Sequence, residues 1–141
     1  MLKAAFYAGI AFTKAYVGYV HAIAHTLGGY YRVPHGLANA VILPYVMEYY
    51  GDTAHQPLSE LADLIGITME SDTKAAKAHK FIAWIRDMNI RMNIPAKLEG
   101  IQETDLPGMI HNALKEANPL YPVPKILFTE DLQKLYAMIR S

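Results

Sequence analysis

The N-terminal part of the chain is an almost uncharged apolar segment, which strongly restricts how the chain can fold. Residues 2–27 consist mainly of Ala, Gly, Phe, Ile, Tyr and Val and are followed by Gly28-Gly29, a pair suited to a left-handed helix cap. Small residues recur along it at Ala4, Ala8, Ala11, Ala15, Gly18 and Ala22. A helix that is apolar on every side is normally buried. The segment therefore predicts one long helix over residues 2–27 in the middle of the domain.

The rest of the sequence also has helical spacing, and no run alternates convincingly at the strand period. A second apolar helix is expected from His35 to about Tyr50, with a kink or short break at Pro44. Further helices are expected over residues 58–65, from Ser71 or Asp72 to Ile94-Pro95, from Asp105 to Asn118-Pro119, and from Thr129 onward. We predict an all-α helical bundle that forms one domain over residues 1–141.

Composition excludes several classes of function. The 13 basic and 13 acidic side chains cancel, and no Lys/Arg-rich run provides an electrostatic footprint for nucleic acid. The chain has no cysteine, which excludes disulfides, thiolate zinc sites and thiol catalysis. We find neither a convincing signal peptide nor a good membrane span, so no membrane partner and a cytoplasmic location are expected.

The chain is apolar for a domain of its size. Hydrophobic residues make up 52% of it and charged residues 18%, against about 25% charged in an average soluble protein. Such a domain either buries an unusual share of its surface or uses one face to meet another molecule. We expect it to associate with itself.

Three of the six histidines fall within fifteen residues. His21 and His25 are four apart, so their side chains lie on one helix face. His35 follows Pro34 at a helix start, where backbone amides and the helix dipole favour the neutral imidazole that binds metals. With a turn at Gly28-Gly29, His35 can return to His21. The residues alone leave both a metal site and a structural histidine network open, and no Asp or Glu lies within a helical turn to complete a site.

The run HAIAHTLGGYYRVPHGLANA, from His21 to Ala40, resembles the signature of the iron-containing (group III) alcohol dehydrogenases. That signature is His-x-x-x-His, then Leu-Gly, then Pro-His-Gly-x-x-Asn-Ala after a short loop. Several fixed residues at fixed spacing make it far more specific than two histidines. The resemblance covers essentially the whole chain, including Ala8-Gly9-Ile10-Ala11-Phe12, Ile94-Pro95, Glu103-Thr104-Asp105-Leu106-Pro107 and Asn118-Pro119.

The resemblance implies a two-domain enzyme that moves hydride between NAD(P) and a primary alcohol or aldehyde in the cleft between its domains. It implies a divalent metal, Fe2+ or sometimes Zn2+, held by one Asp and three His, with His21 and His35 at two of those positions. The resemblance also implies that His25 lies close to the nicotinamide and substrate. We therefore assign His25 a catalytic and cofactor-contacting role, as a substrate contact or proton relay.

The sequence also departs from the family pattern. The family's Asp and remaining His, four apart on a preceding helix, have no match, because Asp52 to His55 and Asp72 to His79 have the wrong spacing. No glycine-rich dinucleotide turn is present either. We therefore expect the catalytic helical half of such an enzyme, without its N-terminal nucleotide-binding domain and with little or no activity alone.

Two alternatives remain open at this stage. One is a non-catalytic helical interaction module with a structural histidine cluster, and the other is a glycerol-dehydrogenase-like domain. His55, His79 and His111 are expected at the surface, and the stripe with Trp84 in a core. The alcohol, the choice between NAD and NADP, and the metal are not determined by the sequence.

Overall fold

Seven α-helices and one short 3₁₀ helix follow one another in the computed structural model, which describes residues 1–141 and contains no strand. The elements are α1 (Leu2–Ala15), α2 (Tyr19–Tyr31), α3 (His35–Tyr50), α4 (Asp52–Leu64), α5 (Lys74–Arg91), η1 (Glu103–Asp105), α6 (Leu106–Leu120) and α7 (Thr129–Ile139). One isolated backbone bridge joins Leu98 to Arg140 near the end of the chain. The predicted all-α class is confirmed.

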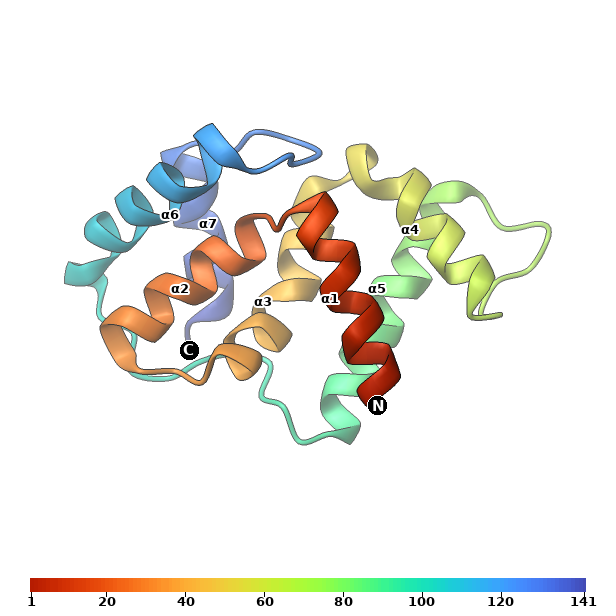
Figure 1. Ribbon diagram of the computed structural model, residues 1–141, viewed down its shortest axis with the longest axis horizontal. Coiled ribbons are helices and arrows are strands. Elements are labelled where there is room, and N and C mark those ends of the chain that lie inside the picture. The colour runs from red at the N-terminus through yellow and green to blue at the C-terminus, as the bar shows by residue number, and fades with distance from the viewer.

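The prediction of one buried helix over residues 2–27 is wrong. The helix is broken at Tyr16, which has a φ of 60°, and α2 begins after Gly18. Tyr19 anchors the start of α2 in the core, where its hydroxyl accepts a 2.8 Å hydrogen bond from the backbone N–H of Leu127. In contrast, α1 has no buried residue and packs against no other helix, and it lies at the front of the molecule in Figure 1. An apolar pattern predicts that a helix packs against another surface, but no other helix of this chain contacts α1.

Two hydrophobic cores hold the domain together. The larger one is built by α2, α3, α6 and α7, and α2 alone contributes five of its residues, Tyr19, Ala22, Ile23, Ala24 and Leu27. The smaller one lies between α4 and α5 and includes Leu58, Ala62, Phe81 and Ile85. Trp84 packs against this smaller core, as predicted. Helix α3 runs between the two halves and contacts both (Figure 1).

Helix α3 has its predicted bounds but continues through Pro44 without the break that the sequence allowed. Proline has no N–H, so the carbonyl of Ala40 loses its helical partner. The side-chain amide of Asn89, on α5, donates a 2.8 Å hydrogen bond to that carbonyl instead. A residue from a neighbouring helix therefore makes the proline tolerable.

Most of the other helix boundaries also agree with the sequence. Helix α4 ends before Gly66 as predicted but begins at Asp52, earlier than the predicted start at Leu58, whereas α6 and α7 begin within a residue of their predicted starts. The predicted cap of α5 at Ser71 or Asp72 is wrong, because the hydroxyl of Thr73 accepts the bond from the N–H of Ala76. Asp72 binds Lys80 and the N–H of Met69 instead.

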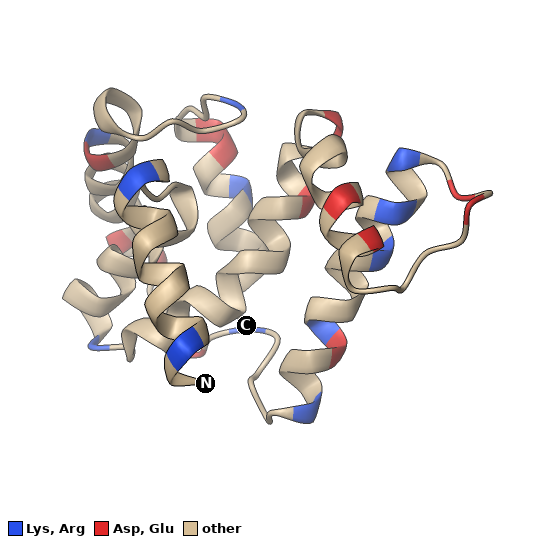
Figure 2. Ribbon diagram, turned by 45° about the vertical axis from the view of Figure 1, so that its right-hand side comes forward, with Lys and Arg blue, Asp and Glu red and all other residues tan.

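Charge is distributed unevenly over the fold. Figure 2 shows many of the acidic and basic residues on α4, α5 and their connection, where Lys77 pairs with Asp63 at 2.8 Å. Helix α2 carries no Lys, Arg, Asp or Glu, and α3 carries only Glu48. No helix combines the length and apolar character that a bilayer crossing requires.

Candidate functional site

The three histidines of the signature converge in the folded chain. His21 and His25 lie one turn apart on α2, and His35 is the first residue of α3. The His35 ring centroid lies 5.3 Å from that of His21 and 5.2 Å from that of His25. His21 and His25 are 6.1 Å apart, centroid to centroid. The fold therefore brings together the three residues that the sequence selected.

The turn that returns His35 to α2 lies later than predicted. Gly28 and Gly29 stay helical, and Arg32 takes the left-handed conformation with a φ of 56°. The hydroxyl of Tyr31 donates to Asp105 at 2.6 Å and accepts from the N–H of Gln102 at 2.9 Å. These bonds tie the last turn of α2 to η1 and its N-cap, which explains why the helix extends past the glycine pair.

Asn39 fixes the ring of His35. Its amide nitrogen lies 2.9 Å from both the backbone carbonyl and the Nε2 atom of His35, one turn earlier on α3. A backbone carbonyl can only accept, so the side-chain atom beside it must be the amide nitrogen and not the amide oxygen. The same nitrogen donates to Nε2, which is therefore an acceptor. The Oδ1 atom of Asn39 is buried without a hydrogen-bond partner. Asn39 and His21 both line a hollow of about 320 Å³ whose other residues include Val20 and Leu43.

The environment of His21 favours its neutral form. Burial, followed by the neighbouring charges of His35 and His25, lowers the pKa of the His21 imidazole from its ordinary value of 6.5. Desolvation and like charges both oppose protonation. The ring therefore retains a free lone pair at neutral pH, and this is the form that binds a metal.

His25 has a partner that the sequence did not reveal. Its Nδ1 atom lies 2.8 Å from Oε1 of Glu116, which α6 brings from 91 residues further along the chain. The same oxygen accepts a 2.6 Å hydrogen bond from the hydroxyl of Tyr121. No local spacing could have found Glu116, because only the packing of α6 on α2 places it beside the cluster.

The donor set fits part of a metal site. No three His, Cys, Asp or Glu side chains are arranged so that they could hold one metal ion. Neutral imidazoles suit Fe2+ and Zn2+, and the environment of His21 supplies one. Asn39, whose Oδ1 is buried without a partner, lines the same hollow as His21. Two imidazoles from His21 and His35 would leave other coordination positions to ligands from elsewhere.

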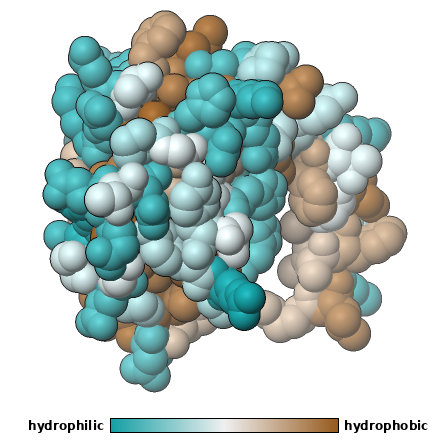
Figure 3. Space-filling model, turned by 90° about the vertical axis from the view of Figure 1, so that its left-hand side faces the viewer, coloured by the Kyte–Doolittle hydropathy of each residue, from teal (hydrophilic) through white to brown (hydrophobic).

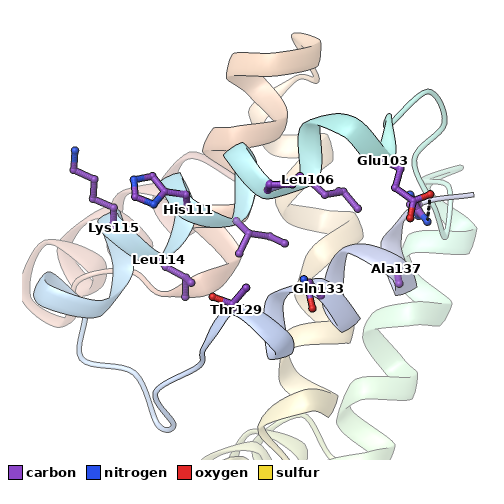
Figure 4. Close-up of a pocket in the computed structure, with 11 residues that line it drawn as sticks. Glu103, Leu106, His111, Leu114, Lys115, Thr129, Gln133 and Ala137 are labelled. Carbon is purple, nitrogen blue, oxygen red and sulfur yellow. Dashed lines mark ion pairs between the residues drawn. The ribbon is translucent and has the colours of Figure 1, made fainter.

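The largest cavity lies away from the cluster of His21, His25 and His35. It occupies about 710 Å³ between α6 and α7, and Figure 4 shows Lys115 and His111 at one end and the Glu103–Arg140 ion pair at the other. No residue of the histidine cluster lines it. Of the histidines expected at the surface, His79 and His111 are exposed, whereas His55 is half-buried beside His79.

The family is established by comparison with known proteins. The model of the "Fe-containing alcohol dehydrogenase family, C-terminal" matches residues 1–139. The chain belongs to this family. It is 41% identical to 1,3-propanediol dehydrogenase from Klebsiella pneumoniae over 120 residues, which are 84% of this chain and 31% of that protein. Alcohol dehydrogenase 4 of Saccharomyces cerevisiae is 38% identical over 83% of this chain and 30% of its own length.

Solved structures of iron-containing alcohol dehydrogenases have the same fold. A crystal structure of 1,3-propanediol oxidoreductase matches 92% of this chain and 34% of its own with a TM-score of 0.84 and 37% identity. Alcohol dehydrogenase from Oenococcus oeni matches 94% of this chain and 35% of its own, also with a TM-score of 0.84, at 33% identity. The chain thus spans about a third of the length of these relatives. The resemblance recognised in the signature is confirmed.

Proposed function

We propose that this chain is the catalytic helical part of an NAD(P)-linked, metal-dependent alcohol dehydrogenase. The reaction is hydride transfer between a primary alcohol or aldehyde and the nicotinamide. The observation that carries the proposal is the convergence of His21, His25 and His35, with ring centroids 5.2–6.1 Å apart, in a member of this family.

His21 and His35 are the proposed metal ligands. A bound Fe2+, or Zn2+ in its place, supplies Lewis-acid chemistry that lowers the pKa of an alcohol. The chain's own contribution is to present the ligands in the right form. Burial keeps His21 neutral. On His35 the Nε2 lone pair accepts a hydrogen from the Asn39 amide, so a metal bound at Nε2 would replace that hydrogen bond. Apolar side chains, such as Val20 and Leu43, line the adjoining hollow.

His25 is the proposed catalytic and cofactor-contacting residue. Its Nδ1 faces Glu116, so its Nε2 is the atom available to a substrate. A neutral imidazole with a lone pair at Nε2 accepts the proton of an alcohol hydroxyl. His25 is therefore assigned proton transfer, while His21 and His35 bind the metal.

The proposal includes partners. NAD(P) needs a nucleotide-binding domain, and these 141 residues contain no glycine-rich dinucleotide turn. Such a domain, a small alcohol or aldehyde substrate, self-association and a cytoplasmic location all belong to the proposal. The names of the relatives make 1,3-propanediol the first substrate to assay.

Metal titration of the purified chain tests the proposal. We expect weak Fe2+ or Zn2+ binding in calorimetry under anaerobic conditions, lost in His21→Ala and His35→Ala and retained better in His25→Ala. His111→Ala, which removes an exposed histidine on α6, is the matched control. Equal binding by wild type, His21→Ala and His35→Ala would refute the ligand assignment.

Activity provides a second arm. The chain alone should show little or no NAD-dependent oxidation of 1,3-propanediol, because it lacks a dinucleotide-binding turn and offers only two of the proposed ligands. Robust oxidation by the purified chain, abolished in His21→Ala, would instead place a complete active site within these 141 residues.

A further inference from the structure

We propose that Glu116 and Tyr121 are positioning residues that fix the tautomer of His25, with the proton on Nδ1 and the lone pair on Nε2. The catalytic meaning of this inference rests on the proposed function, because it concerns the residue assigned to proton transfer. The tautomer itself is a property of the chain and can be measured without metal, cofactor or substrate.

The hydrogen bonds determine which nitrogen carries the proton. An ionised carboxylate only accepts hydrogen bonds, and Oε1 of Glu116 lies 2.8 Å from Nδ1 of His25. Nδ1 must therefore donate. A neutral imidazole has one N–H and one lone pair, so protonation of Nδ1 leaves the lone pair on Nε2.

Tyr121 fixes the carboxylate in turn. Its hydroxyl donates to the same Oε1 atom at 2.6 Å. Burial, together with the nearby Glu116, raises the pKa of the Tyr121 phenol to about 12, so the hydroxyl remains a donor at neutral pH. Two donors on one oxygen restrict the rotamer of Glu116, as a second set of hydrogen bonds does for catalytic and metal-binding histidines.

The ring of His25 is restrained from a second direction. It stacks on His35 with an interplanar angle of 18°, while the hydrogen bond to Glu116 lies along its edge. The Glu116 side chain is 29% exposed and that of His25 46%, so water screens the pair only in part. Neither His21 nor His35 pairs with a carboxylate, which leaves Glu116 as the acidic partner of the cluster.

The tautomer matters because only a lone pair can receive a proton. If Nε2 carried the hydrogen, His25 would offer a substrate hydroxyl another donor and could not act as a base toward it. Glu116 prevents this by binding the hydrogen at the opposite nitrogen. The role resembles that of the carboxylates that orient an imidazole in other enzymes and do not themselves exchange the proton, although Glu116 is partly exposed.

Nitrogen NMR of the chain tests the inference directly. In ¹⁵N-histidine-labelled, EDTA-treated protein at about pH 8, where imidazoles are neutral, the long-range ¹H–¹⁵N pattern of His25 should show the Nδ1–H form. Glu116→Ala should shift the tautomer ratio toward Nε2–H by about tenfold, as expected for the loss of a charge-assisted hydrogen bond. Tyr121→Phe should shift it in the same direction by less.

Control variants separate positioning from folding. Glu99→Gln removes a carboxylate from an exposed loop position without an ion pair and should leave the His25 pattern unchanged. The amide spectra of the variants should otherwise match wild type, which shows that α6 still packs on α2. The inference fails if wild-type His25 is mainly Nε2–H, or if Glu116→Ala folds normally and leaves the tautomer ratio unchanged.

The two proposals can fail separately. If every histidine variant still bound metal while the His25 tautomer depended on Glu116, only the ligand assignment would be overturned. Conversely, metal binding that depends on His21 and His35, with a His25 tautomer indifferent to Glu116, would overturn only the positioning role.

Discussion

The side-chain amide of Asn89 donates a 2.8 Å hydrogen bond to the backbone carbonyl of Ala40. This bond crosses from α5 to α3 and satisfies the carbonyl that Pro44 leaves without a helical partner. Asn89 is one of only three buried polar residues in the chain. The bond therefore stabilises α3 beyond its first turns, and α3 carries His35 at its N-terminus.

We expect Asn89→Ala to lower the free energy of unfolding by about 1–3 kcal/mol, because it leaves a buried carbonyl unsatisfied. Urea unfolding followed by circular dichroism measures the change. Pro44→Ala is the matched background, since it restores the N–H that the Ala40 carbonyl lacks. In that background Asn89→Ala should cost clearly less, and equal costs in both backgrounds would refute the link between Asn89 and Pro44.

Local patterns predicted much of this fold, and the reason is visible in particular elements. Helices α3, α4, α6 and α7 have apolar spacing and end signals such as Gly66, which act within a few residues. The break at Tyr16 was not predictable in this way, because it depends on Tyr19 reaching Leu127 more than a hundred residues away. The tolerance of Pro44 likewise depends on Asn89 from another helix.

The N-cap of α5 gives a sharp local test. The hydroxyl of Thr73 accepts from the N–H of Ala76 at 3.2 Å, so Thr73→Ala should destabilise the chain by about 1 kcal/mol. Ser71→Ala, at a position that the sequence suggested as a cap, should leave stability unchanged. Thermal unfolding of both variants decides the matter, and a larger loss in Ser71→Ala would contradict the cap assignment.

The stability of the chain should depend on Asp131 at acid pH. The backbone N–H of Phe128 and the hydroxyl of Tyr49 both donate to this carboxylate and hold its pKa below the ordinary value of 3.8. A depressed folded-state pKa adds stability that is fully present well above pH 3.8 and is lost as the pH falls through the folded pKa.

Asp131→Asn should therefore be less stable than wild type at about pH 6, and the difference should shrink as the pH falls below about 4. Urea midpoints measured across this range test the prediction. Glu99→Gln, at an exposed position without an ion pair, should show no such convergence. A wild-type advantage that persists at about pH 2 would show that ionised Asp131 is not its source.

The candidate site was partly predictable for the same reason as the fold. His21 and His25 share a helix face by spacing, and His35 belongs to the same short signature, so a local pattern identifies all three although the turn between them lies later than predicted. Glu116 and Tyr121 come from α6 and the segment after it, and only tertiary packing reveals them. The sequence thus identifies the three histidines, but not Glu116 and Tyr121, which are proposed to orient His25.

We expect the chain alone to self-associate through α1, because this helix exposes large apolar side chains and contacts no other helix. Figure 3 shows a mostly hydrophobic ridge on the right that stands apart from the teal body. This ridge corresponds to α1, which lies at the front in Figure 1. Phe6 and Ile10 are one turn apart on it and 66% and 45% exposed. Burying a large apolar side chain contributes about 1.5–3 kcal/mol, so Phe6→Gln with Ile10→Gln should weaken association at least about tenfold. Sedimentation and light scattering measure this, with Leu64→Gln, an exposed leucine on α4, as control. A monomeric wild type at high concentration, or equal association by the double variant, would show that α1 does not mediate contacts between copies of this chain.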